Sequence, residues 1–123
     1  MGFDHPSELQ VYYSMPSHRD IRIESASLRF IPVETRVPLK FGSETLTSVT
    51  CARASVTVAN ASGIEATGWG ETPLSVQWVW PSSISYSERH EDLKDFTSRL
   101  CPKLSAISAY GHALGLGHEF LFN

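Results

Sequence analysis

The fold is decided by the stretch ARASVTVANASGIEATGWGE, which spans residues 52–71. The two-residue alternation of apolar and polar side chains, with β-branched residues among them, predicts a half-buried strand over residues 49–59. Asn60 and Gly63 tolerate positive φ and predict a hairpin loop. A second alternation follows over residues 64–71. The stretch therefore predicts two antiparallel strands joined by a short loop.

The second of these strands combines glycines with a tryptophan. Gly68 and Gly70 lie on one face, and glycines inside a strand indicate close approach by another backbone. Trp69 lies on the opposite face and is expected to pack in the core.

An earlier strand is predicted from Ile21 onward. Apolar and polar residues alternate there, and the alternation slips by one position near Ser25, which predicts a β-bulge. Pro32 and Pro38 cannot donate to a sheet ladder, so the strand is expected to fray into a loop over residues 35–43, with Gly42 as its turn residue. The three strands together predict an antiparallel meander.

The remainder of the chain predicts a loop and then helices. Residues 73–81 are predicted to be a loop that carries Trp78 and Trp80. Ser85 and Glu88 have capping-box spacing, and apolar residues at three- and four-residue spacing predict an amphipathic helix over 86–101, stopped or bent by Pro102. These apolar residues are Leu93, Phe96, Leu100 and Leu104. A second helical segment is predicted over 102–110, with Gly111 as its C′ residue. The fold class is therefore α+β.

Chain length and net charge exclude some classes of function. The 123 residues amount to one domain, predicted over 21–123 behind a polar N-terminal arm at 1–20. A net charge of −3 offers no basic footprint for nucleic acid, and the apolar runs are far shorter than a membrane span. The start has no signal-peptide pattern, and Cys51 and Cys101 form no disulfide framework. These features predict a cytoplasmic protein with reduced thiols.

No catalytic or metal-binding set is predicted from the residues. His112 and His118 are not at the i, i+4 spacing that puts two ligands on one helical face, so helix capping or surface exposure is expected for them instead of metal binding with Glu119. The chain has no GxGxxG phosphate loop and no GxSxG nucleophile elbow. Glu65 and Glu71 are expected on a solvated face of their strand.

Two motifs carry a resemblance to a known family. The sequence RVPLKFG at 36–42 follows the first strand, and GWGETPL at 68–74 closes the meander before the helices. In this order the chain resembles the N-terminal capping domain of the enolase superfamily, in its mandelate racemase and muconate-lactonising branch. The resemblance covers residues 21–123.

The resemblance implies a role over a partner domain. Such capping domains close over the mouth of a (β/α) barrel, where Mg²⁺ assists proton abstraction α to a carboxylate. The reaction could be that of a racemase, epimerase, dehydratase or cycloisomerase. The barrel strands that supply metal ligands and bases are absent, so no catalytic residue and no bound Mg²⁺ are expected in this chain, and it is not expected to be active alone. The apolar end at 120–122 suggests a truncated chain.

The resemblance also implies two substrate-facing loops. A small carboxylate substrate would meet them in the intact enzyme, where Lys40 either pairs with the carboxylate or is a solvated surface charge, and Gly42 permits loop motion. Trp78 and Trp80 either face the ligand or interface, or pack the loop onto the helices. The first loop comprises Leu39, Lys40, Phe41, Gly42 and Ser43, and the second contributes Pro73, Leu74, Trp78 and Trp80.

A second hypothesis belongs to a different class of function. The chain could be a stand-alone binding or oligomerisation module that has kept the capping fold without the barrel. A cap without its barrel would expose apolar surface, which favours a homo-oligomer. The terminal segment Phe120–Phe122 is the expected contact.

Overall fold

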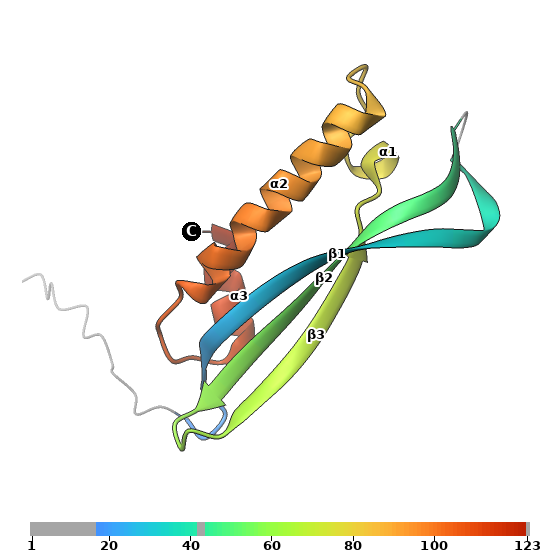
Figure 1. The fold of residues 1–123 in the computed structure, drawn as a ribbon. Coiled ribbons are helices and arrows are strands. Elements are labelled where there is room, and N and C mark those ends of the chain that lie inside the picture. The colour runs from blue at the N-terminus through green and yellow to red at the C-terminus, as the bar shows by residue number, and fades with distance from the viewer. Residues whose placement is uncertain (1–16, 42–43, 123) are drawn as a thin grey trace, which may run out of the picture.

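A three-stranded antiparallel sheet followed by helices makes up the computed structural model, which describes residues 17–41 and 44–122 (Figure 1). The strands lie in the order β1-β2-β3, and the predicted α+β meander is confirmed. Most of the predicted N-terminal arm, residues 1–16, lies outside the described residues. The elements are β1 (Ile21–Phe41), β2 (Glu44–Asn60), β3 (Glu65–Pro73), α1 (Val76–Val79), α2 (Tyr86–Ser105) and α3 (Ala113–Phe122).

The hairpin of β1 and β2 is longer than the sequence predicts. A register shift between Ile23 and Ser25 confirms the predicted bulge. The loop predicted over 35–43 is wrong in part: regular pairing ends at Glu34 as expected, but it resumes from Leu39 to Phe41 after a second irregularity. β1 is an edge strand, so a proline can lie in it without breaking the ladder of a central strand. The predicted turn residue Gly42 is outside the described residues.

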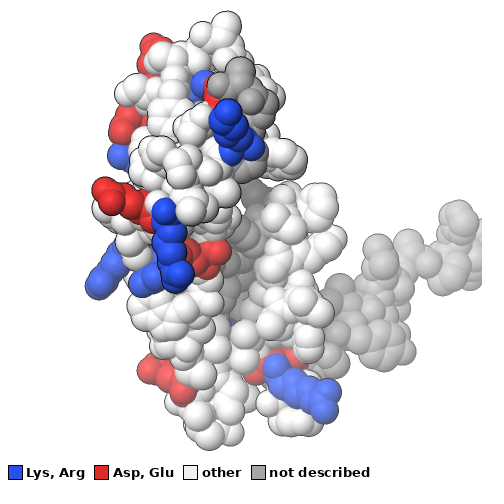
Figure 2. All heavy atoms as spheres, turned by 90° about the vertical axis from the view of Figure 1, so that its right-hand side faces the viewer, with Lys and Arg blue, Asp and Glu red and all other residues white. Residues whose placement is uncertain are grey.

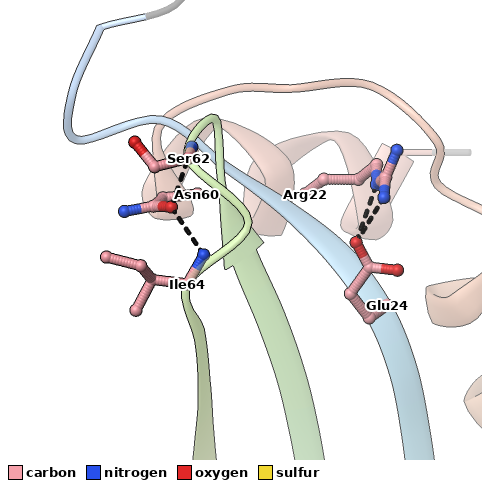
Figure 3. Close-up of polar contacts among 5 residues, drawn as sticks. All are labelled: Arg22, Glu24, Asn60, Ser62 and Ile64. Carbon is pink, nitrogen blue, oxygen red and sulfur yellow. Dashed lines mark hydrogen bonds and ion pairs between the residues drawn. The ribbon is translucent and has the colours of Figure 1, made fainter.

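The turn between β2 and β3 follows the prediction. The side-chain oxygen of Asn60 accepts hydrogen bonds from the backbone N–H groups of Ser62 and Ile64, each at 3.0 Å (Figure 3). Gly63 has a φ of 78°, which a residue with a side chain rarely adopts. The asparagine and the glycine thus fix the turn that their residue types predicted. Figure 3 also shows Arg22 of β1 donating to the Glu24 carboxylate at the bulge.

The two faces of the sheet differ in what covers them. α2 packs against β1, and Figure 1 shows α2 and α3 on one side of the sheet. The other face is polar and exposed: the Ser27 and Ser55 hydroxyls lie 2.7 Å apart, and an ion pair joins Arg53 to Glu71. The expectation that Glu71 lies on a solvated face is therefore confirmed. The sheet is covered on one side only, and mainly over β1.

The core is small and has two parts: Ile23, Ala59 and Leu116 are buried at the end of the sheet near Gly111, and a second group is buried where β3 runs into α1. Val76 is fully buried, and Leu46, Leu74 and Cys51 are buried near it along the chain or the sheet. Trp69 is 66% exposed, so its predicted core position is wrong: its strand has no helix behind it and its side chain lies on the polar face. The close approach predicted at Gly68 and Gly70 is wrong too, since a Cβ at either position would meet nothing within 4 Å.

The predicted start of α2 is confirmed and its predicted end is wrong. The Glu88 N–H donates to Ser85 Oγ at 3.2 Å, and the Ser85 hydroxyl donates to the Glu88 carboxylate at 2.6 Å. The helix continues through Pro102 to Ser105, because only the bond to the carbonyl four residues back is lost and the Ala106 N–H donates to the Pro102 carbonyl at 3.0 Å.

The predicted helix over 102–110 is also wrong. Residues 107–112 form no helix; instead the Gly111 N–H and carbonyl exchange hydrogen bonds with Ile21, each 3.0 Å long, and α3 begins at Ala113. Gly111 therefore extends the edge of β1 and does not cap a helix. None of the helices in the described ranges is both long and apolar enough to cross a membrane.

Candidate functional site

The first predicted loop is the end of the β1–β2 hairpin. Leu39 and Lys40 pair with Leu46 and Thr45, and both side chains are exposed. The backbone of Phe41 ends β1, while Gly42 and Ser43 lie outside the described residues. The described part of this segment is therefore strand, which holds Leu39 and Lys40 at the end of a two-stranded extension of the sheet (Figure 1).

The second predicted loop contains a helical turn that the sequence did not indicate. The N–H groups of Trp78 and Val79 both donate to the Ser75 carbonyl at 3.0 Å, and Val76, at 0% exposure, anchors the turn in the core. The expectation of an irregular loop over the whole of 73–81 is therefore wrong. The burial of a single valine explains why this short segment is ordered.

The side chains of the second segment point to different environments. Trp78 is 75% exposed, and Pro73 is exposed at the end of β3. Trp80 is half-buried. Leu74 is buried, so its side chain belongs to the core and not to the outer surface. Of the four residues, Trp78 has the side chain best placed to meet a partner.

The β2 strand of the hairpin lies beside the second segment at one end of the sheet. Leu46, on the strand that pairs with Leu39, lines a cavity of about 30 Å³ with Ser75, Gln77 and Trp78. That volume has room for about one water molecule, so Leu46 of β2 lies close to the α1 turn. A ligand at this end would lie on the outer surface of the two segments, which together form an open face and not an enclosed pocket.

Hydrogen bonds from β2 and α2 position this end. The Thr50 carbonyl accepts from the Leu74 N–H at 2.8 Å, and the Thr50 hydroxyl lies 2.9 Å from His90 Nε2. The Tyr86 and His90 rings stack with centroids 5.7 Å apart. Thr50 of β2 thus connects the turn after β3 to the first turns of α2.

Arg89 is a positioning residue that the sequence reasoning missed. It is the buried charged residue of the described structure, with its Nη1 donating to the Trp80 carbonyl at 2.6 Å and its Nε to the Ser85 carbonyl at 3.4 Å. An arginine among charged helix residues is normally solvated, so its spacing alone did not mark it. Its position four residues after the Ser85 cap is the one signal that could have done so. Arg89 ties the end of α1 to the start of α2.

Cys51 lies beside this end but is not an activated nucleophile. It is buried opposite Pro73 in the β2–β3 ladder. Burial is the main cause that raises the pKa of the Cys51 thiol, and the charge of Glu71 and a hydrogen bond to it act in the same direction. The Arg53 charge opposes them. Because the thiolate is the reactive form, the thiol is held in its unreactive protonated state.

The hollows between α2 and α3 lie away from the two predicted segments. A cavity of about 360 Å³ is lined by residues that include Lys103 and Glu119, and an apolar one of about 180 Å³ lies between the helices and the sheet. Residues lining the apolar cavity include Leu28, Leu100, Cys101, Leu104 and Phe120. Both depend on how α3 folds back onto the sheet, which the sequence did not predict.

The described residues contain no group of three or more His, Cys, Asp or Glu side chains placed to hold a metal ion. His112 Nδ1 accepts the Leu114 N–H at 3.3 Å at the start of α3, which confirms the predicted capping. The His118 ring lies 4.6 Å from the Phe122 ring. The predicted substrate-facing residues Leu39, Lys40, Pro73 and Trp78 carry no carboxylate, so they do not fit Mg²⁺, which prefers oxygen ligands.

The face seen in Figure 2 carries charges of both signs. Lys and Arg side chains alternate there with Asp and Glu, and no large field of one sign forms. This agrees with the small net charge and offers no nucleic-acid footprint on that face.

Comparisons of the chain with family models, with curated proteins and with solved structures found no match.

Proposed function

We propose that this chain is the capping and substrate-recognition domain of an enzyme similar to mandelate racemase and muconate-lactonising enzyme. The observation that carries the proposal is the cavity that Leu46, the β2 partner of Leu39, lines together with Trp78, because it places the β1–β2 hairpin beside the α1 turn. Large apolar side chains are exposed at this end, as expected of a surface that a partner domain covers. They are Val37, Leu39, Trp78 and Val79.

The chemistry would belong to the partner barrel. The reaction class is proton abstraction α to a carboxylate, with the metal and the bases on the barrel. This chain would contribute recognition and exclusion of water: Trp78 would give apolar contact area, and Lys40 would offer an exposed ammonium to the substrate carboxylate. No step of proton transfer is assigned to a residue of this chain.

The test is association with a barrel. The chain is titrated by calorimetry against the isolated barrel domain of a muconate-lactonising enzyme, as wild type and as Trp78→Ala. We expect the substitution to weaken binding by at least about tenfold, as for an aromatic anchor at the centre of an interface. Trp69→Ala is the matched control, because Trp69 is a similarly exposed indole on the polar face of β3, and it should bind as the wild type does.

Two results would contradict the proposal. One is equal binding by the two tryptophan variants, and the other is an absence of binding altogether. Exchange of the α-proton of carboxylate substrates by the chain alone, with Mg²⁺ added, would overturn the assignment of the chemistry to the barrel.

The exposed face of α3 favours a second candidate function, a stand-alone oligomerisation module. Leu114, Leu121 and Phe122 are all exposed large apolar side chains of this helix. If α3 is the contact, light scattering should show a mass that rises with concentration, and Leu121→Ser should abolish the rise. A mass unchanged by that substitution would count against this candidate.

A further inference from the structure

Among the described residues, β3 has an outer edge that lies open along its whole length, whereas the outer edge of β1 is bridged at Ile21. β3 pairs with β2 on one side, and within the described ranges no strand pairs with its other side. All nine of its residues are exposed. β1, the other edge strand, carries α2 and the bridge to Gly111. The sheet therefore has one edge strand that packs against a helix and carries a bridge, and one whose residues are all exposed.

The hydrogen-bond alternation identifies which backbone groups of β3 face outward. At one end of the β2–β3 ladder the Asn60 N–H donates to the Ile64 carbonyl, and at the other the Leu74 N–H donates to the Thr50 carbonyl. Both bonds use even-numbered residues on the β3 side. Because bonding alternates along an antiparallel pair, the even-numbered residues bond to β2. The odd-numbered residues, Glu65, Thr67, Trp69 and Glu71, direct their N–H and carbonyl groups to the open edge.

Along most of its length this edge lacks the features that keep sheet edges from pairing; Glu65, Glu71 and Pro73 are the exceptions. Natural edges are protected by lysines, prolines, bulges or a covering helix. β3 contains no lysine or arginine, its register with β2 is unbroken from Cys51–Pro73 to Ala59–Glu65, and its proline is its last residue. The helix-side positions Gly68 and Gly70 have nothing within 4 Å of a Cβ. The edge is a template for another strand.

We propose that a second copy of this chain pairs with it, β3 against β3 in antiparallel orientation, with the two-fold axis at Trp69. Charge selects this register. Outward-facing groups meet only when odd-numbered residues oppose odd-numbered ones, and the Trp69-centred register sets Glu71 opposite Thr67 of the second copy. A shift that sets Thr67 opposite Trp69 would bring Glu65 opposite Glu71, and like charges directly opposite each other are destabilising. A shift the other way leaves Glu65 outside the paired strands.

The side chains on both faces suit this pairing. On the polar face the exposed Trp69 ring would lie against its symmetry mate, and the Arg53 guanidinium already balances the Glu71 charge. On the helix side Gly68 would oppose Gly70, where no side chain obstructs the approach. α2 lies over β1 and leaves β3 uncovered (Figure 1). The two sheets would join into one continuous sheet.

This contact is independent of the proposed capping function. It uses the length of β3, whereas the proposed substrate-facing surface uses Leu39, Lys40 and Trp78. Dimerisation could therefore fail while barrel binding holds, and the reverse.

Cysteine cross-linking tests the register. Trp69→Cys and Thr67→Cys are each made in the full chain, with the parent chain and its Cys51 and Cys101 as background. Directly opposed bonded residues have Cα atoms about 5.5 Å apart, which a disulfide spans. After mild oxidation we expect a covalent dimer with Trp69→Cys and only background with Thr67→Cys, since Thr67 would face Glu71. Equal cross-linking at both positions would overturn the register.

Sedimentation velocity tests the pairing with both native cysteines in place and Trp69 retained. We expect the parent chain to pass from monomer to dimer between about 1 μM and about 1 mM. Thr67→Pro removes one outward N–H and should stay monomeric with an unchanged circular dichroism spectrum, while Thr67→Ala should dimerise as the parent does. A strictly monomeric parent would overturn the proposal. So would a dimer kept by Thr67→Pro, including one that Leu121→Ser alone abolishes.

Discussion

β3 and the turn that follows it are continuous in the chain, yet they have opposite environments. Trp69 in β3 is largely exposed, while Val76 in α1 is the fully buried side chain of the described structure. The tryptophan is the larger hydrophobic residue, so hydrophobicity does not explain the difference. α1 contacts α2, whereas β3 has β2 as its main neighbour and no helix behind it. The turn after β3 is therefore buried where β3 is open, and removing a side chain at the turn should cost more free energy of unfolding than removing one from β3.

The largest effect should come from removing a buried side chain at that turn. Leu74→Ala should lower the free energy of unfolding by about 3 kcal/mol, through lost apolar burial and the cavity that remains. Ile64→Ala is the control: Ile64 directly precedes β3 and is exposed, so its removal should cost less than about 0.5 kcal/mol. Urea unfolding followed by circular dichroism measures both. A similar loss of stability for Leu74→Ala and Ile64→Ala would contradict the expectation that the turn contributes more to stability than the open strand.

A smaller effect is expected at the link between α1 and α2. Arg89→Met keeps the side-chain length but leaves the Trp80 carbonyl without its donor, which should cost about 2 kcal/mol. Arg99→Met removes an exposed ion pair with Asp95 on the same helix and should cost less than about 0.5 kcal/mol. Thermal unfolding of the pair gives the comparison. If Arg89→Met destabilised the protein no more than Arg99→Met, the hydrogen bond from Arg89 to the Trp80 carbonyl would not stabilise the link between α1 and α2.

The cap of α2 should contribute less again. Ser85→Ala removes the acceptor of the Glu88 N–H and should destabilise the fold by about 1 kcal/mol. Ser87→Ala, two residues further along and exposed, should be neutral or slightly stabilising because alanine favours helix. The same urea titration resolves the two, and an equal response would mean that the cap is not the reason the helix begins there.

The smallest effect is a pH dependence at the border between the turn and β3. The pKa of the folded Cys51 thiol is raised above its ordinary value of 9.0, mainly by burial. The unfolded thiol therefore loses its proton first, so the stability that Cys51 contributes is complete below 9.0 and is lost as pH rises through the folded pKa. Urea midpoints at about pH 8 and about pH 10 should show this fall.

The controls for this pH dependence are two cysteine variants and one charge variant. Cys51→Ala should reduce the fall, while Cys101→Ala should keep it. Glu71→Gln should reduce it in part, since the Glu71 charge is one cause of the raised pKa. A fall unchanged by Cys51→Ala would assign it to another group.

Local chemistry explains what the sequence predicted. The alternation over 52–58, the turn at Asn60 and Gly63 and the cap at Ser85 depend on neighbours within a few residues, and the structure confirms each. The two segments that the resemblance predicted to face a substrate were predicted as separate loops, without any indication that one lies near the other. Only the fold brings Leu46 to Trp78.

The errors have one physical origin, which is tertiary context. The proline at 102 was expected to stop or bend a helix ending at 101, but the helix continues to Ser105 and the Ala106 N–H donates to the Pro102 carbonyl. Trp69 was expected in the core because indoles usually are, but no helix covers its strand. The spacing of Arg89 from the Ser85 cap is a local signal, but it does not show that the Trp80 carbonyl would need a buried donor. Each depends on where α2 lies, and spacing along the chain does not contain that information.

The bridge between Ile21 and Gly111 sets an order of events during synthesis. Ile21, at the start of β1, exchanges two backbone hydrogen bonds with Gly111, which is synthesised near the end of the described chain. At ribosomal rates of about 5–20 residues per second, the two are separated by on the order of ten seconds. The meander can assemble in that interval, but the outward N–H and carbonyl groups of Ile21 bond to water until Gly111 is in place. A nascent chain stalled before Gly111 should accordingly be more open to proteases around Ile21 than one released from the ribosome.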